Sequence, residues 1–383
     1  MEDAAVFAHR VSLHLFYLQA GVYPLKTKSI RFILFLATIS AVFFLIYCNI
    51  FQSSSLSGGS DGMLMLRARE VMRNAMQTLK SEAENRGIAI DRITDPNETG
   101  LIGLDYSPIT TTLGHLEAKR SSVNPDSAAM ICGILLGAGL KPGDSVAIGS
   151  SASFPGFLIA TLSACKVLEL NPVTFISVGA SQYGANNPDF TLIDQMETLE
   201  KAFGKYFSVD AVSTGGNNDI ADDLDPETQA LILEKIRKSG YRLISEPDFV
   251  KNVQLRMALY DELKKNPVKL FINIGGAEAN MGTSFEVLNL EPGLNQKIEK
   301  IPPENERGVI YEFARRGTDV LHLLYVKGLC LRYGLSWDPV PFTDESYKSL
   351  IFFHEGNDNG FVIFYIFFIA CIFGTYAVFK FLK

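Results

Sequence analysis

Two long uncharged apolar runs near the two ends constrain this chain more than any other feature of its sequence. Residues 32–50 are FILFLATISAVFFLIYCNI and residues 360–379 are GFVIFYIFFIACIFGTYAVF, and neither run contains a formal charge. A helix of about twenty apolar residues matches the hydrocarbon thickness of a bilayer. We therefore predict that the lipid bilayer holds one transmembrane helix near each end, at residues 32–51 and 360–380.

The first run is also compatible with the apolar core of a cleaved signal peptide. The small residues that follow Gln52, SSSLSGG, would supply a cleavage site. However, the run is longer than the roughly 7–15 apolar residues of such cores, and it starts far from the N-terminus. Its length favours an uncleaved anchor.

Basic residues flank the two runs asymmetrically. Lys26, Lys28 and Arg31 precede the first run, and Lys380 and Lys383 close the second. Under the positive-inside rule, such residues stay in the cytoplasm. We therefore predict a two-pass protein of the cell membrane whose main domain is extracytoplasmic. Its parts are a cytoplasmic segment (1–31), a flexible tether (52–62), an α/β domain (63–359) and a cytoplasmic tail (381–383).

Between the two runs, short β-rich segments alternate with longer amphipathic ones. The predicted strands are residues 145–149, 173–179, 209–215 and 269–275. The predicted helices are residues 63–86, 124–140, 157–170, 191–206, 226–239, 248–265 and 308–334. This alternation predicts an α/β fold with a mainly parallel sheet and helices on both faces.

Loops rich in Gly, Ser and Asn follow the four predicted strands, at residues 149–156, 179–188, 213–219 and 275–282. Glycine in a tight turn explains any one of these loops, but four loops of one composition favour a shared site. In open α/β sheets, ligands bind outside the carboxyl ends of the strands. Exposed backbone N–H groups there suit carboxylates, phosphates or sugar hydroxyls. The predicted ligand-binding residues are Thr110, Thr111, Lys119, Arg120, Ser150, Ser151, Ser153, Ser181, Gln182, Asn186, Asn217, Gly275 and Gly276.

Nucleophilic catalysis is a more specific hypothesis for this region than ligand binding alone. Ser151 and Ser153 lie in GSSAS, which lacks the final glycine of the GxSxG elbow of serine hydrolases. A serine nucleophile needs a base, and His115 is a better candidate than His322, which lies in an apolar stretch. Glu278 is a further candidate acid or base, or a structural partner of Lys119 or Arg120. These residues leave both an enzyme and a binding protein open.

Several other classes of site lack a positive signal in the sequence. A net charge of −7 without a basic stripe gives no reason to expect nucleic acid as a partner. The five cysteines are widely spaced and include no CxxC pair, so we predict no zinc site. The acidic segment 217–225 does not have EF-hand spacing, and we interpret it as a solvated face that ends in a helix cap at Asp225. Without a Walker A or GxGxxG motif we predict no cofactor.

Long blocks of the sequence are similar to a known family. Residues 103–120 (GLDYSPITTTLGHLEAKR), Asn124–Pro125, residues 149–155 (GSSASFP) and residues 178–188 (VGASQYGANNP) resemble the bacterial poly-gamma-glutamate system protein family. The resemblance covers roughly residues 60–340 and leaves the first 25 residues outside.

What the resemblance implies is an accessory membrane protein of poly-gamma-glutamate or capsule loci. Its partners would be the membrane components of the poly-gamma-glutamate synthase and the anionic polymer, a chain of glutamates joined through their side-chain carboxyls. The family supplies no catalytic residues to carry over. We predict that the chain binds the polymer or the synthase complex through its Gly-, Ser- and Asn-rich loops, and the alternative is an extracytoplasmic serine hydrolase or transferase that acts on the gamma-glutamyl polymer.

Overall fold

The computed structural model describes Thr38 and residues 60–343, and residues 60–343 fall within a single compact unit. Apart from Thr38, the two predicted spans at 32–51 and 360–380 lie outside the described residues, as do the cytoplasmic segment and tail. Within the described part of the chain, no helix combines the length and apolar character needed to cross a bilayer.

The domain is built on a seven-stranded sheet with the order β6-β5-β3-β2-β7-β9-β8, in which only β8 runs antiparallel to its neighbour. The strands are β2 (Ser145–Ser151), β3 (Asn171–Ser177), β5 (Ala211–Ser213), β6 (Arg242–Ile244), β7 (Val268–Ile274), β8 (Gly293–Asn295) and β9 (Asp319–Leu323). A separate two-stranded parallel sheet pairs β1 (Thr110–Thr112) with β4 (Ala180–Ser181). The predicted α/β fold with a mostly parallel sheet is confirmed.

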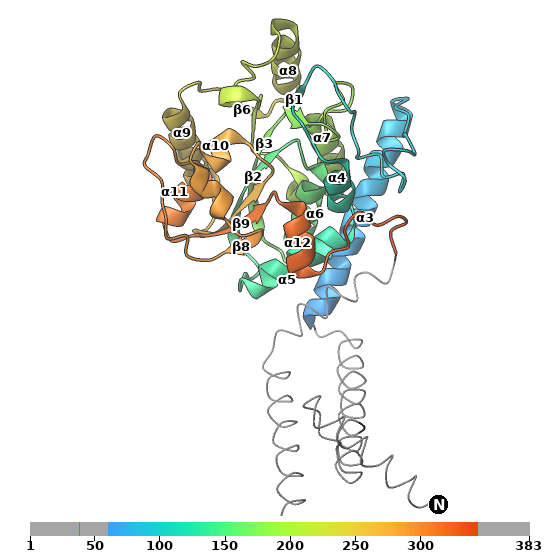
Figure 1. Ribbon diagram of the computed structural model, residues 1–383, viewed down its shortest axis with the longest axis horizontal. Coiled ribbons are helices and arrows are strands. Elements are labelled where there is room, and N and C mark those ends of the chain that lie inside the picture. The colour runs from blue at the N-terminus through green and yellow to red at the C-terminus, as the bar shows by residue number, and fades with distance from the viewer. Residues whose placement is uncertain (1–37, 39–59, 344–383) are drawn as a thin grey trace, which may run out of the picture. The chain divides into compact units, whose positions relative to one another are not determined.

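Helices cover both faces of the sheet (Figure 1). They are α3 (Ser60–Asn85), α4 (Leu116–Ser122), α5 (Asp126–Gly137), α6 (Pro155–Val167), α7 (Leu192–Phe203), α8 (Pro226–Ser239), α9 (Phe249–Leu263), α10 (Glu278–Met281), α11 (Val309–Arg315) and α12 (Val326–Tyr333). Short 3₁₀ turns lie at Lys205–Phe207, Asn217–Asp219 and Phe285–Asn289.

Successive strand residues point to opposite faces of the sheet, so each strand contributes side chains to two separate cores. Val146 and Ile148 of β2 belong to the core under α3, α5 and α6, whereas Ala147 between them belongs to the core under α9 and α11. In the second core, Phe175 and Tyr260 stack with ring centroids 4.0 Å apart. Strands buried on both faces explain why their sequences are continuously apolar.

Two predicted boundaries are wrong. Residues 60–62, expected in the tether, form the first turn of α3, where Asp61 lies at the positive end of the helix dipole. Residues 308–334, predicted to be helical with Thr318 or Asp319 as a cap, form α11, the strand β9 and α12. Gly317 has a φ of +78° and follows the end of α11, which lets the chain return to the sheet as β9, between β7 and β8.

The order of the strands creates a switch point between β2 and β7. From β2 the chain adds β3, β5 and β6 on one side, and then returns to add β7 and β9 on the other. Ser151 pairs with Ser177 of β3, and Ser150 pairs with Ile274 of β7, so the three central strands end at the same edge. A ligand crevice is expected at this edge.

Candidate functional site

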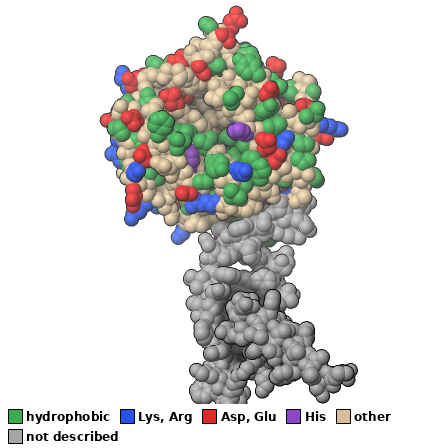
Figure 2. All heavy atoms as spheres, viewed as in Figure 1, with side chains coloured by type: hydrophobic (Ala, Val, Ile, Leu, Met, Phe, Trp, Pro, Cys, Tyr) green, Lys and Arg blue, Asp and Glu red, His purple; other side chains and the backbone are tan. Residues whose placement is uncertain are grey.

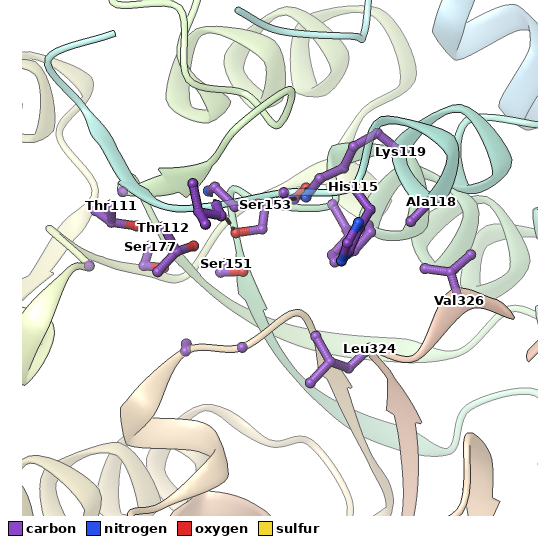
Figure 3. Close-up of a pocket in the computed structure, with 18 of the residues that line it drawn as sticks. Thr111, Thr112, His115, Ala118, Lys119, Ser151, Ser153, Ser177, Leu324 and Val326 are labelled. Carbon is purple, nitrogen blue, oxygen red and sulfur yellow. Dashed lines mark hydrogen bonds between the residues drawn. The ribbon is translucent and has the colours of Figure 1, made fainter. Parts of the chain in front are cut away.

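A cavity of about 780 Å³ lies at the switch point. All four of the loops predicted to share a site contribute to its wall, and so does the segment that runs from Thr111 to Lys119. Ser177, Asp223, residues 324–327 and Trp337 complete the lining. Figure 3 shows Lys119, His115, Ser151 and Ser153 gathered around this space, opposite Leu324 and Val326.

The cavity wall is held together by contacts between segments that are distant in sequence. The β1–β4 pairing joins residues 110–112 to residues 180–181. The backbone N–H of Ala185 donates to the carbonyl of Ala152 over 2.8 Å, which ties the second loop to the first. At Gly184 an added Cβ would lie 2.7 Å from the same carbonyl oxygen, so only glycine allows this approach.

Lys119 is the most unusual residue of the cavity. It comes from α4, is 2% exposed, and donates from its Nζ to the Ser181 hydroxyl over 2.6 Å and to the Ser153 carbonyl. The Nζ also lies 3.7 Å from the centroid of the Phe154 ring. Burial without a nearby carboxylate lowers the pKa of Lys119 to about 7. The amine is therefore partly neutral at neutral pH.

Three of the four serines predicted to lie at the site, Ser151, Ser153 and Ser181, line the cavity and have different surroundings. The Ser181 hydroxyl contacts Lys119, and the Ser181 backbone N–H donates to the Ser153 hydroxyl over 3.0 Å. The Ser151 hydroxyl is buried, and among the described residues it has no hydrogen-bond partner. It lies against Gly275, where an added Cβ would approach the Ser151 Oγ to 2.2 Å.

The predicted acid–base residues line the cavity but do not contact these serines. The exposed His115 side chain makes no hydrogen bond or ion pair to any part of the chain that the structure describes. The Glu278 carboxylate accepts from the backbone N–H of Asn218 over 3.2 Å. It forms no ion pair with Lys119 or Arg120, the partners considered for it in the sequence. Lys119, rather than His115, forms a hydrogen bond with a serine hydroxyl of the cavity.

Some predicted ligand-binding residues support the wall rather than line the cavity. Seven of the thirteen do line it: Thr111, Lys119, Ser151, Ser153, Ser181, Asn217 and Gly276. The others are Thr110, Arg120, Ser150, Gln182, Asn186 and Gly275. Asn186 is buried and bonds to the backbone of Leu104 and to the Thr110 hydroxyl. The Ser150 hydroxyl donates to the Ser151 carbonyl, and Gln182 bonds to Gly114 and Asp105.

Arg120 forms an ion pair with a residue that is distant in the sequence. Its guanidinium forms two hydrogen bonds with the Asp338 carboxylate, at 2.6 and 2.5 Å. Both side chains are less than one-fifth exposed. This pair holds the chain near Trp337 against α4. Arg120 therefore positions part of the cavity wall and does not line the cavity itself.

The acidic segment after β5 is exposed at Asp222, Asp223 and Asp225, as predicted, but not at Asp219. Asp225 does cap α8, as predicted, by accepting from the backbone of Glu227 and Thr228. Asp219, however, is buried and paired with Arg256 of α9. The Ser213 hydroxyl donates to the same carboxylate over 2.7 Å. Sequence reasoning missed Arg256, because nothing in a run of helical residues marks one arginine as buried.

Charges of both signs surround the cavity. Glu117, Asp223 and Glu278 line it together with Lys119 and Lys327. In Figure 2, acidic and basic side chains are scattered over the face in view, without a continuous basic patch among the coloured residues. Among the described residues, no group of three or more His, Cys, Asp or Glu side chains is placed to hold a metal ion.

Comparisons of the chain with protein-family models, with curated proteins and with solved structures gave no match.

Proposed function

We propose that the chain is a membrane-anchored accessory component of poly-gamma-glutamate synthesis or export, and that its switch-point cavity binds the glutamyl chain. The convergence of the four strand-end loops and residues 111–119 on one cavity carries the binding part of this proposal. The anchoring part rests on the two uncharged runs and their basic flanks. The choice of polymer rests on the sequence blocks that resemble the family.

The mixed charge of the cavity favours one part of the polymer over the rest. A long run of carboxylates would meet Glu117, Asp223 and Glu278 as well as Lys119, so broad attraction to a polyanion is weak. The amino end of a glutamyl chain carries an ammonium and a carboxylate together. Such an end offers a partner to both the acidic and the basic residues, and the loop amides suit its peptide groups.

Trp337 provides a direct test of binding. It is the only tryptophan of the chain, it lines the cavity, and it is 40% exposed, so a ligand that replaces water beside it changes its fluorescence. We expect gamma-linked glutamyl oligomers to change the emission of the full chain in detergent micelles in a saturable manner. Alpha-linked oligomers of the same length are the matched ligands and should bind more weakly.

Gly276 offers a matched pair of variants for the same titration. An added Cβ there meets Met281 and Leu324 only at 3.7 and 3.9 Å, which is ordinary contact. Gly276→Ala should therefore keep binding, whereas the longer side chain of Gly276→Leu should fill part of the cavity and weaken it. The absence of any saturable change with gamma-linked oligomers, in a folded chain, would contradict the proposal.

A further inference from the structure

The contact between Lys119 and Ser181 has the components of a nucleophile and its base. Both residues are at most 5% exposed, and both line the cavity. Within the described residues, no carboxylate forms an ion pair with Lys119. The Ser181 hydroxyl lies 2.6 Å from the Lys119 Nζ, which is within the range for proton transfer.

Neighbouring elements fix the geometry of this contact. Ser181 belongs to β4, whose pairing with β1 holds its backbone. Its backbone N–H is used by the Ser153 hydroxyl, which leaves the Ser181 side chain to Lys119. Lys119 is held from the other side by the Ser153 carbonyl and the Phe154 ring. Both reacting groups are thus positioned before any ligand arrives.

We propose that Ser181 is a nucleophile and Lys119 its general base, so that the cavity cleaves or transfers an amide bond of the glutamyl chain. This inference rests on the proposed function, because it takes the glutamyl chain as the ligand of the same cavity. Ser–Lys pairs are an established variant of the serine–base arrangement. The lowered pKa of Lys119 supports it, because only the neutral amine accepts a proton.

The reaction balances with water as the only co-reactant. The Ser181 oxygen attacks the amide carbonyl carbon while its proton passes to the Lys119 amine. The carbon–nitrogen bond then breaks, and the Lys119 ammonium returns that proton to the leaving amine, which leaves an ester on Ser181. Water attacks the ester, gives a proton to Lys119, and Ser181 recovers it as the acid departs. A second amine in place of water would give transfer instead of hydrolysis.

The other serines fit this role less well. Ser151 has no base within hydrogen-bond distance, since its hydroxyl lacks a partner among the described residues. The Ser153 hydroxyl accepts the Ser181 N–H rather than contacting an amine. His115, the base expected from the sequence, forms no hydrogen bond with either serine among the described residues. The geometry therefore points to Ser181, which the sequence suggested only as a ligand-binding residue.

A fluorophosphonate probe tests the pair on the full chain in detergent micelles. We expect peptide mass spectrometry to find the label on Ser181, and the labelling rate to rise with pH about a midpoint near 7, the pKa of Lys119. Lys119→Met removes the base, and Lys119→Arg keeps the charge without a usable base. Both should slow labelling by roughly 100-fold or more. Lys300→Met and Ser208→Ala, which lie outside the cavity, serve as matched controls.

The outcomes separate this inference from the proposed function. Label on another serine, no label, or a rate without a titration near pH 7 would overturn the pair. A merely structural lysine would change the melting temperature of its variants but would not give this pH profile. The Trp337 titration of Ser181→Ala reports binding independently. If gamma-linked oligomers still bind while Ser181 is never labelled, the binding proposal stands and the catalytic one fails.

Discussion

Adjacent residues of α4 show how strongly the surroundings of a side chain decide its chemistry. Lys119 enters the cavity without a carboxylate partner, whereas Arg120 forms a bidentate ion pair with Asp338. In the sequence both residues are equivalent candidates for neutralising a ligand. In the structure only Lys119 faces the cavity, and its burial makes it a weak cation and a usable base.

Lys119 should give folding stability a defined pH dependence. The folded-state pKa is lowered to about 7 from the usual 10.5, so between these values the unfolded chain binds one more proton than the folded chain. The free energy of unfolding therefore rises with pH in this window, by up to about 1.4 kcal/mol per pH unit.

Urea unfolding of the wild type and of Lys119→Met between about pH 7.5 and 9.5 measures this contribution. The variant lacks the titrating group, so its unfolding free energy should rise less steeply with pH than that of the wild type. Equal slopes in the two proteins would show that Lys119 is charged in the folded state.

At the scale of elements, the period of the apolar pattern decided what could be predicted. The runs that became β2, β3, β5 and β7 are short, apolar and bounded by glycine, and their strand character was visible in the sequence. β9 was not, because DVLHL continues into LYVKGLCLRY, and a short apolar run joined to a helical one has an ambiguous period. The edge strand β6 was missed because Arg242 and Leu243 are exposed and form no continuous apolar run.

The site was predictable only as far as sheet topology determines it. Loops after parallel strands must share an edge, so the sequence indicated that residues near Ser151, Ser181, Asn217 and Gly276 lie together. It could not indicate which side chains point inward. The Arg120–Asp338 contact joins residues 218 apart, and the Lys119–Ser181 contact joins residues 62 apart. Neither contact can be recognised from the residues next to it in the sequence.

The buried pair between Arg256 of α9 and Asp219 should be essential to the loop after β5. Both side chains are 4% exposed, and Ser213 and Asn252 complete the network around them. Arg256→Met leaves a buried carboxylate without its cation, which should lower the free energy of unfolding by roughly 3–5 kcal/mol. Chemical denaturation measures the loss.

Arg237 provides the matched control for this experiment. It pairs with Glu234 on the surface of α8, and its side chain is 71% exposed, so Arg237→Met should change stability little. Replacing Asp219 by Asn in the Arg256→Met background removes the unpaired charge and should recover part of the loss. A cost for Arg256→Met no larger than that for Arg237→Met would mean that the network contributes little.

At the scale of the whole molecule, the proposed function depends on which side of the membrane the domain occupies. A protein that handles an exported polymer must meet it outside the cytoplasm, and the basic flanks of the two apolar runs predict this orientation. Single cysteines introduced at Ser57 and Ser346, which lie between the two predicted spans in the sequence, report on this orientation. Both should react with an impermeant thiol reagent on intact cells, whereas a cysteine at Lys383 should react only after lysis.

The three native cysteines within the described residues should add little background to this measurement. Cys132, Cys165 and Cys330 are buried, and desolvation raises the pKa of Cys132 to about 12 and that of Cys330 to about 11. Their reactive thiolates are therefore scarce, and the unsubstituted chain supplies the blank. Protection of both introduced cysteines on intact cells, followed by labelling after lysis, would place the domain in the cytoplasm. The cavity would then face the site where the polymer is made rather than its exported form, and cytoplasmic glutamyl chains would become the ligand to test.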